Sequence, residues 1–228
     1  MAAAEPSDMF TGIVETTGEI VGREATDEGV RLTVAAPGLD DLHHGQSISV
    51  SGVCLTVEAF GADVEGVDEA VDEADDATAA TGDRDRFEVF LAAETVAKTY
   101  LGDLRAGDRV NVERAMPADG RFDGHLVQGH VDTVATVEAV ASVGEDWRLT
   151  VSIPAGFGQY LVQKGSVTLD GISLTVAERR ADAFEVAIIP TTYEVTTLSE
   201  KEPGDPLHLE VDVIAKYVEN MVEGYAAD

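Results

Sequence analysis

Two short stretches of the chain carry the same pattern of small polar residues, and these residues are the first candidates for chemistry. Ser47–Val57 reads SISVSGVCLTV and Ser166–Val176 reads SVTLDGISLTV, with five of eleven positions identical. The first stretch places Cys54 two residues before Thr56, and the second has a serine and a threonine at the same places. Thiol and hydroxyl groups donate and accept hydrogen bonds. The repeat therefore predicts two similar polar faces within one chain.

The elements that must position these groups are β-hairpins. In the first copy apolar residues alternate with Cys54 and Thr56, so a strand here has one apolar and one polar face. The second copy alternates in the same way, with Ser173 and Thr175 on its polar face. A two-residue turn of the tight-hairpin type precedes each of these strands: Ser51-Gly52 and Asp170-Gly171.

The duplication extends over most of the chain. Gly12–Gly18 (GIVETTG) resembles Gly129–Ala135 (GHVDTVA) at an offset of 117 residues, and Glu94–Glu113 parallels Thr191–Glu210 at an offset of 97. The hairpins are 119 residues apart, so the first half contains 22 extra residues after its hairpin. They fall in segment 61–86, which has ten acidic residues and no aromatic residue and predicts a solvated loop. A metal-binding loop is the alternative, but the segment lacks the ligand order of an EF-hand.

Short alternating segments separated by glycine-rich turns predict an all-β fold, duplicated as two similar barrels. Two helices are expected in addition. One is short, at Thr95–Leu101. The other spans Asp212–Tyr225, with apolar residues at helical spacing and Asp212 as its N-cap. Its apolar stripe would either lie on its own barrel or join copies of itself from other subunits.

The charge balance is strongly acidic, with 44 acidic and 15 basic residues and a formal net charge of −29. Such a surface repels nucleic acid and anionic lipid, so neither is expected as a partner. It is typical of a protein solvated in a salt-rich cytoplasm, where short Debye lengths screen self-repulsion. No apolar run reaches the roughly 18 residues of a membrane span, and the first residues lack a signal-peptide pattern, so a soluble cytoplasmic protein is expected. Cys54 is the only cysteine, which excludes an intrachain disulfide.

Five motifs in one order resemble the riboflavin synthases of the alpha-chain type: MFTGIVE (Met9–Glu15), GVCLTV, LGDLRAGDRVNVERA (Leu101–Ala115), GHLVQGHVD (Gly124–Asp132) and GISLTV. The resemblance covers Met9 to about Met221. It implies two tandem six-stranded Greek-key barrels and a C-terminal helix through which three subunits assemble. The expected domains are an extension at 1–8, a lumazine-binding barrel at 9–104 with the insert at 61–86, a second such barrel at 105–210 and a trimerisation helix at 211–228.

The reaction that the resemblance implies accounts for the duplication. Riboflavin synthases transfer a four-carbon unit between two molecules of 6,7-dimethyl-8-ribityllumazine, giving riboflavin and 5-amino-6-(D-ribitylamino)uracil. Two identical substrates need two similar pockets that face each other. In the family each active site lies between the N-terminal barrel of one subunit and the C-terminal barrel of its neighbour. No cofactor or metal is implied, because the lumazine ring itself stabilises the negative charge formed at its C7 methyl group.

Carried over position by position, the resemblance implies a pocket in each half. The first would be lined by Gly12, Ile13, Val14, Cys54, Leu55, Thr56, Phe90, Leu91, Ala92, Ala93, Glu94 and Thr95. The second would be lined by Gly124, His125, Leu126, Lys164, Ser173, Leu174, Thr175, Ile189, Pro190, Thr191, Thr192, Tyr193 and Glu194. Both sets include the polar pair of a hairpin, so the alternation pattern and the resemblance agree there.

Four polar residues match positions implicated in the family's chemistry: Ser47, Cys54, His125 and Asp212. Ser47 or Cys54 would activate water or orient a ribityl hydroxyl at the acceptor ring. His125, which titrates near neutrality, would carry a proton. Cys54 has a serine as its counterpart in the second half, so obligatory thiol chemistry is not expected. Taken alone, Cys54 is also typical of a small buried residue, and His125 of a histidine in a loop or at a strand end.

Other polar residues have simpler interpretations. His130 is interpreted as structural and His43-His44 as exposed. Lys164 is either a ligand-binding residue or a residue beside a turn. The repeated carboxylates Glu113 and Glu210 are expected to be solvated.

The chain departs from the family pattern in four places. Met9-Phe10 lie inside the chain rather than near its start, and the acidic insert directly precedes the pocket wall at Phe90–Thr95. Val53 replaces a frequent second cysteine. Thr191 stands where the second half commonly has glutamate, so the contact of this position with the ring or the ribityl chain is left open.

Two other functions compete with the enzyme. A chromophore carrier resembling the lumazine proteins needs only one working pocket, whereas both halves of this chain keep the polar pair. A flavin-binding reductase barrel would need a nicotinamide-binding α/β domain, for which no residues remain. The sequence therefore favours a transferase of the riboflavin synthase type.

Overall fold

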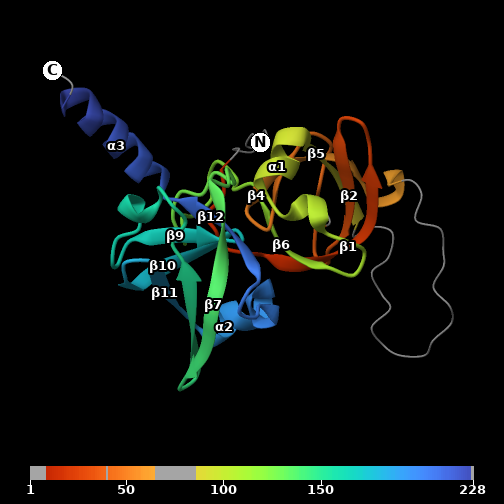
Figure 1. Ribbon diagram of the computed structural model, residues 1–228. Helices are drawn as coiled ribbons and strands as arrows, with labels where there is room; N and C mark the ends of the chain where they lie inside the picture. Colours follow the sequence, from red (N-terminus) through yellow and green to blue (C-terminus); the bar gives the residue numbers. More distant parts are fainter. Residues whose placement is uncertain (1–8, 40, 65–85, 227–228) are drawn as a thin grey trace.

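The computed structural model describes residues 9–39, 41–64 and 86–226 and contains two closed six-stranded barrels followed by a helix (Figure 1). The first barrel consists of β1 (Thr16–Ala25), β2 (Gly29–Ala35), β3 (Ser47–Val50), β4 (Val53–Phe60), β5 (Arg86–Ala92) and β6 (Arg109–Arg114). The second consists of β7 (Thr133–Val143), β8 (Asp146–Ser152), β9 (Ser166–Leu169), β10 (Ile172–Arg179), β11 (Ala183–Ile188) and β12 (Pro206–Val211). The α-helices are α1 (Ala93–Lys98), α2 (Pro190–Val195) and α3 (Val213–Ala226). The predicted all-β fold of two tandem barrels and a C-terminal helix is confirmed.

Both barrels have the same strand order. Each is closed and antiparallel, running β1-β2-β5-β4-β3-β6 in the first and β7-β8-β11-β10-β9-β12 in the second. Each has its own apolar core, represented by the fully buried Leu32 and Val89 in the first barrel and Leu149 and Val186 in the second. Two separate cores follow from the alternation of the strands, since each barrel turns one face of every strand inward.

The domain boundary expected after residue 104 is wrong. Strand β6 lies C-terminal to that position, yet it pairs with β1 and β3 and closes the first barrel. Without it both strands would be left as open sheet edges. The predicted loop at 61–86 falls mostly on 65–85, outside the described residues, as does the extension at 1–8.

The repeated hairpins form as predicted, and their turns meet between the barrels. Ser51 and Gly52 have φ values of 44° and 83°, and Asp170 and Gly171 have 46° and 81°, the left-handed backbone of a type I′ turn. A Cβ atom on Gly52 would lie 2.5 Å from the backbone nitrogen of Gly171. The contact between the two hairpins therefore requires glycine at this position.

Around these turns, counterpart residues make matching contacts with different side chains. Asn111 donates through Nδ2 to the Asp170 carbonyl at 2.9 Å. Its counterpart His208 bonds the Ser51 carbonyl through Nδ1 at 2.7 Å and accepts from the Tyr100 N–H at Nε2, at 3.0 Å. The imidazole is therefore neutral, with its proton on Nδ1. Each barrel thus fixes the turn of the other through a buried side chain.

The helices differ from the prediction at two places. The first was expected at Thr95–Leu101, but α1 begins at the end of β5, with Glu94 in its first turn, where a negative charge favours a helix N-terminus. It ends where Thr99 adopts an extended backbone. Its repeat counterpart α2 was not expected. For α3 the predicted N-cap is confirmed, because Asp212 Oδ1 accepts from the N–H of Ile214 at 2.9 Å.

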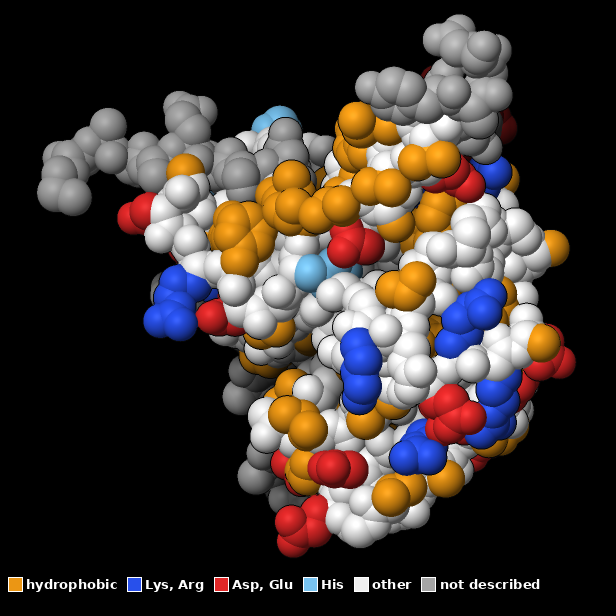
Figure 2. Space-filling view, turned by 90° about the vertical axis from the view of Figure 1, so that its left-hand side faces the viewer, with side chains coloured by type: hydrophobic (Ala, Val, Ile, Leu, Met, Phe, Trp, Pro, Cys, Tyr) orange, Lys and Arg blue, Asp and Glu red, His pale blue; other side chains and the backbone are white. Residues whose placement is uncertain are grey.

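Helix α3 projects away from the second barrel (Figure 1). An ion pair of 2.7 Å between Lys216 and Asp132 fixes its first turns to that barrel. Its apolar residues stay 53–68% exposed: Ile214, Tyr217, Val218, Met221 and Val222. Figure 2 faces the side from which α3 projects and shows hydrophobic side chains gathered in its upper part. The stripe therefore does not lie on its own barrel.

In the described part of the chain, the helices are too short or too polar for a membrane span.

Candidate functional site

Two short segments cross between the barrels, and we call residues 10–14 the first arm and residues 127–131 the second arm. Phe10 and Val127 pair in antiparallel fashion, with N–H···O distances of 2.8 and 3.1 Å. Gly12 of the first arm accepts at its carbonyl from the Ser173 N–H of the second barrel, at 2.8 Å. The crossing brings each arm into contact with the barrel of the other half of the repeat.

The second arm repeats this contact in the opposite direction. The Gly129 carbonyl accepts from the Cys54 N–H of the first barrel, also at 2.8 Å. Both glycines have positive φ, 75° at Gly12 and 72° at Gly129. A Cβ atom on either would lie 2.7 Å from the Cβ of Ser173 or Cys54, respectively. Only glycine therefore lets the arms approach the polar pairs so closely.

The crossing corrects the predicted grouping of the pocket residues. Gly12, Ile13 and Val14 were expected beside Cys54, but the structure places this arm on the second barrel, where Val14 packs against the apolar core. The residues beside Cys54 are instead those of the second arm, 129–131, with Val131 packed against the first core. The prediction missed them, although the repeat of GIVETTG as GHVDTVA identifies them as counterparts of Gly12–Val14. His130, interpreted as structural, is exposed.

On the second barrel, His125 links two hydroxyl groups. Its Nδ1 lies 2.6 Å from Ser173 Oγ and its Nε2 lies 3.2 Å from Thr168 Oγ1. Burial lowers the pKa of His125 from its usual value, and the nearby Asp212 carboxylate opposes this shift. A neutral imidazole has one donor and one acceptor nitrogen. The chain of hydroxyl, imidazole and hydroxyl can therefore move a proton across the outer face of this barrel.

The first barrel carries a different set of groups on its outer face. Strand pairing places Ser47 opposite Thr56 and Ser49 opposite Cys54. The four catalytic candidates therefore fall into two groups: Ser47 with Cys54 on the first barrel, and His125 with Asp212 on the second.

Two buried carboxylates hold the arms. Glu113 Oε1 accepts from the N–H and the hydroxyl of Thr11 at 2.8 and 3.0 Å, and its Oε2 accepts from the Gly12 N–H at 3.1 Å. Glu210 Oε1 accepts from the Gln128 N–H at 2.7 Å. The prediction that both are solvated is wrong, since only 5% of Glu113 and 3% of Glu210 is exposed beneath the arms. Desolvation raises the pKa of each to about 7.

The other predicted residues differ in their exposure. In the first wall Leu91 is buried in the barrel core, whereas Ala92, Ala93 and Glu94 are exposed. Thr56 and Thr175 are exposed, but the side chains of Leu55 and Leu174 point into the cores, so only their backbone can contact a ligand.

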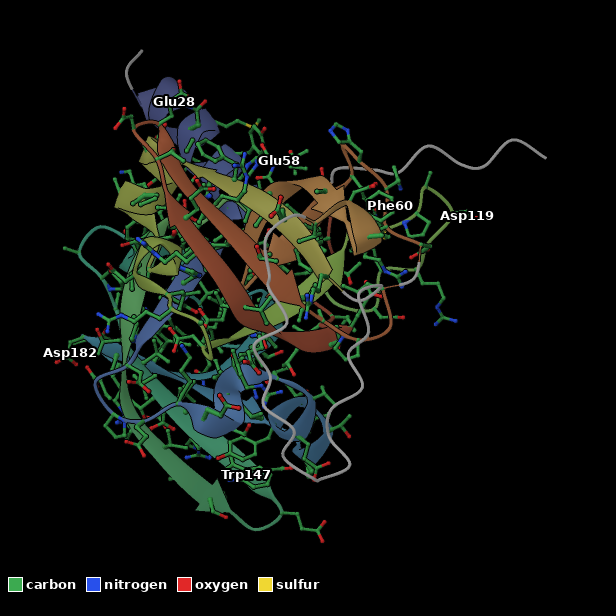
Figure 3. The ribbon with its side chains drawn as sticks, turned by 90° about the vertical axis from the view of Figure 1, so that its right-hand side faces the viewer. Glu28, Glu58, Phe60, Asp119, Trp147 and Asp182 are labelled. Atoms are coloured by element: carbon green, nitrogen blue, oxygen red, sulfur yellow. The ribbon has the colours of Figure 1, made fainter. Side chains whose placement is uncertain are left out.

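The rim of the second barrel contains its own aromatic pair. Tyr193 of α2 stacks on Trp147 of β8, which lies toward the lower end of the view in Figure 3, with ring centroids 3.9 Å apart, and Ile189 before it is exposed. Lys164 is exposed with a φ of 70°, which suits a turn. Gly124 lies against Ser173, since a Cβ there would be 2.9 Å from the serine Cβ.

Two cavities open at counterpart positions of the repeat, and the first of them is lined in part by the first arm. The first, about 500 Å³, is lined by polar and charged residues that include Gln46, Glu113 and Arg114, together with Ile13. The second, about 430 Å³, lies at the base of α3, and Asp212 lines it with mainly apolar neighbours. Among the described residues no cluster of three or more histidine, cysteine or acidic side chains could hold a metal ion.

The fold and the paired polar faces define a tandem-barrel protein with two equivalent ligand-binding faces. The sequence pattern of the lumazine binding domain matches residues 11–115 and 128–212. The chain is 47% identical over 221 residues to the riboflavin synthase of Mycobacterium tuberculosis, covering 94% of this chain and 98% of that protein. It is 36% identical over 211 residues to the riboflavin synthase of Bacillus subtilis, covering 92% and 88%. The chain therefore belongs to the riboflavin synthase family of lumazine-binding proteins.

Solved structures resemble the fold. LumP complexed with riboflavin superposes with a TM-score of 0.74 at 21% identity, over 90% of this chain and all of that one. LumP complexed with 6,7-dimethyl-8-(1'-D-ribityl) lumazine gives a TM-score of 0.72 at 20% identity, over 89% and 99%. At this identity the likeness concerns the tandem-barrel fold.

Proposed function

We propose that this chain is a riboflavin synthase, which converts two molecules of 6,7-dimethyl-8-ribityllumazine into riboflavin and 5-amino-6-(D-ribitylamino)uracil. The observation that carries the proposal is that both barrels keep a complete polar face, with Cys54 and Thr56 on one and Ser173 and Thr175 on the other, each beside a crossing glycine. Relatives that match nearly the full length are riboflavin synthases. A protein that held a single chromophore would need only one such face.

The transfer is between identical molecules, so it balances without an oxidant, a reductant or a cofactor. A base removes a proton from the C7 methyl group of one ring, and a nucleophile adds to C7 of the other ring. The methyl carbanion then attacks this second ring, which gives up its four carbons as their bonds to N5 and N8 break and 5-amino-6-(D-ribitylamino)uracil leaves. Holding the two rings in reacting geometry is the main task of the protein. His125 accepts and returns protons through Ser173 and Thr168, its neighbours at 2.6 and 3.2 Å. On the other barrel Ser47 and Cys54 orient the nucleophile, water or a ribityl hydroxyl, at C7 of the second ring.

The active form is a homotrimer in which the first barrel of one subunit faces the second barrel of its neighbour. The support for this is the exposed apolar stripe of α3, since stripes of this kind are buried when helices associate. Val218→Glu places a charge in the stripe and is expected to give monomers and at least tenfold lower activity. Light scattering after size exclusion, run on both proteins, measures the outcome. A Val218→Glu variant that stays trimeric would contradict this role of α3.

The enzyme works in a salt-rich cytoplasm. The net charge of −29 supports this, because self-repulsion of such a surface weakens as salt shortens the Debye length. The midpoint of thermal unfolding is expected to rise between 0.1 and about 2 M KCl. A midpoint that is independent of salt would contradict this assignment.

The decisive experiment mixes the purified protein with 6,7-dimethyl-8-ribityllumazine in high salt, without cofactor, and follows riboflavin by absorbance. One riboflavin for every two lumazines consumed supports the proposed reaction. Tight binding without turnover would indicate a chromophore carrier instead, and no binding would contradict both. Ser173→Ala serves as the matched variant, since it removes the hydroxyl bonded to His125. We expect its turnover to fall by about tenfold to 100-fold.

A further inference from the structure

The peptide of Gly12 is held from both barrels at once. Its N–H donates to Glu113 of the first barrel at 3.1 Å, and its carbonyl accepts from Ser173 of the second barrel at 2.8 Å. Glu113 also binds the N–H and the hydroxyl of Thr11, so this single carboxylate accepts three hydrogen bonds from two adjacent residues. The position of the first arm on the second barrel therefore depends on a side chain of the first barrel.

The second arm has a related arrangement with the barrels exchanged, in which the glutamate bonds the residue before the glycine. Glu210 of the second barrel accepts from the N–H of Gln128, the residue before Gly129, at 2.7 Å. The carbonyl of Gly129 accepts from the Cys54 N–H of the first barrel at 2.8 Å. Each glutamate is thus connected to the polar pair of the opposite barrel through a short stretch of arm backbone, at Gly12 for Glu113 and from Gln128 to Gly129 for Glu210.

We propose that Glu113 and Glu210 are positioning residues that act across the molecule: Glu113 sets the ligand-binding face around Ser173, and Glu210 sets the face around Cys54. Neither glutamate needs to touch a ligand for this role. Each fixes an arm whose glycine packs directly against the polar pair. A Cβ atom built on that glycine would lie only 2.7 Å from the Cβ of Ser173 or of Cys54. The consequence for catalysis rests on the proposed function, but the coupling itself does not.

Burial of these carboxylates supports the assignment. A carboxylate with under a tenth of its surface exposed is costly unless it is well bonded, and simple packing would be served by an apolar side chain. The two oxygens of Glu113 accept from consecutive backbone N–H groups, Oε1 from Thr11 and Oε2 from Gly12. A glutamine here keeps the shape but turns an NH₂ group toward one of these donors.

Hydrogen exchange of two amides, followed by NMR on the ligand-free full chain, tests the crossed pattern. The N–H groups of Ser173 and Cys54 report on the two arms, because each donates to an arm glycine. Glu113→Gln is expected to speed exchange at Ser173 about tenfold and to leave Cys54 within about twofold. Glu210→Gln is expected to do the reverse. Thr11→Val, which removes one bond to Glu113 without changing the volume, should act like Glu113→Gln but more weakly.

A matched control separates this role from the general loss of a buried carboxylate. Glu185 of β11 is 4% exposed and pairs with Arg148 and Arg180, and among the described residues it forms no hydrogen bond or ion pair with either arm. Glu185→Gln is expected to leave the ratio of the exchange rates of the Ser173 and Cys54 amides unchanged. Faster exchange confined to the barrel that carries the substitution, or equal changes at both amides, would overturn the proposal.

Activity is then a separate readout. If the proposed function holds, Glu113→Gln and Glu210→Gln each lower the turnover of 6,7-dimethyl-8-ribityllumazine, whereas Glu185→Gln does not. If the unchanged protein gives no turnover but the crossed exchange pattern is present, the proposed function fails and the coupling stands. If turnover is normal but the pattern is absent, only the coupling fails.

Discussion

The two barrels share their backbone geometry but not their chemistry. The glycines of the two arms have φ values of 75° and 72°, and each accepts a hydrogen bond of 2.8 Å from the opposite barrel. At counterpart side chains the halves differ: Cys54 against Ser173, Ser51 against Asp170 and Asn111 against His208. The shared backbone geometry indicates that both halves must hold an arm over a binding face. What differs suits two identical molecules that play unlike roles in one reaction.

The largest expected effect tests the shared part of this comparison. Gly12→Ala and Gly129→Ala should each lower the free energy of unfolding by about 3 kcal/mol, because the positive φ and the contact at 2.7 Å both exclude a Cβ atom. Denaturant unfolding measures the two losses. Equal losses support equivalent arms. A variant that unfolds like the original chain would show that its arm does not need the close approach.

The next effect separates the two hairpin turns. Asp170 binds the His208 N–H at 2.7 Å and forms a 2.9 Å ion pair with Lys201, whereas Ser51 accepts only a 3.1 Å bond from the Asn111 N–H through its hydroxyl. Asp170→Asn leaves the Lys201 ammonium group largely buried without its partner and should cost about 3 kcal/mol. Ser51→Ala should cost about 1 kcal/mol. Equal costs in urea titrations would mean that the ion pair adds nothing.

The pH dependence of stability distinguishes Asn111 from His208. Burial lowers the pKa of His208 below its usual 6.5, while the Asp170 carboxylate partly opposes this shift. The neutral ring therefore contributes stability that is present above pH 6.5 and is lost as the pH falls below it. His208→Asn, which copies the first barrel, should remove up to about 2 kcal/mol of this loss between pH 7 and pH 5.

The readout for His208→Asn is the difference in unfolding free energy between variant and original chain at each pH. Loss of the stacking of His208 on Tyr100, at 3.8 Å, shifts this difference by a constant amount. A difference that does not change between pH 7 and pH 5 would contradict a neutral buried imidazole.

The smallest effect concerns the polar pairs themselves. Cys54→Ser gives the first barrel the residue of the second and should change kcat by less than about threefold. Ser173→Cys makes the reverse exchange and should lower kcat about tenfold, since a thiol is a weak partner for the imidazole of His125 at 2.6 Å. Steady-state kinetics on both variants give the comparison. A decrease in kcat of more than about threefold for Cys54→Ser would assign an essential role to the thiol.

The sequence by itself determined the two hairpins, the two barrels and the terminal helix. These follow from local patterns: Cys54 and Thr56 alternate with apolar residues, the turns carry glycine, and Asp212 precedes a stripe at helical spacing. The repeat also identified the counterpart polar pairs. Local patterns of this kind are readable because each residue's environment depends on its nearest neighbours along the chain.

Only the tertiary structure decided which half completes which binding face. Gly12 was grouped with Cys54 because both belong to the first half, but its arm lies on the second barrel. Glu113 and Glu210 were expected to be solvated because a carboxylate near a turn usually is, and the arms bury them instead. The physical reason is the same for both errors. Contacts between segments about 100 residues apart depend on how the two folded barrels dock. The alternation of apolar and polar residues along the strands of one barrel carries no information about that docking.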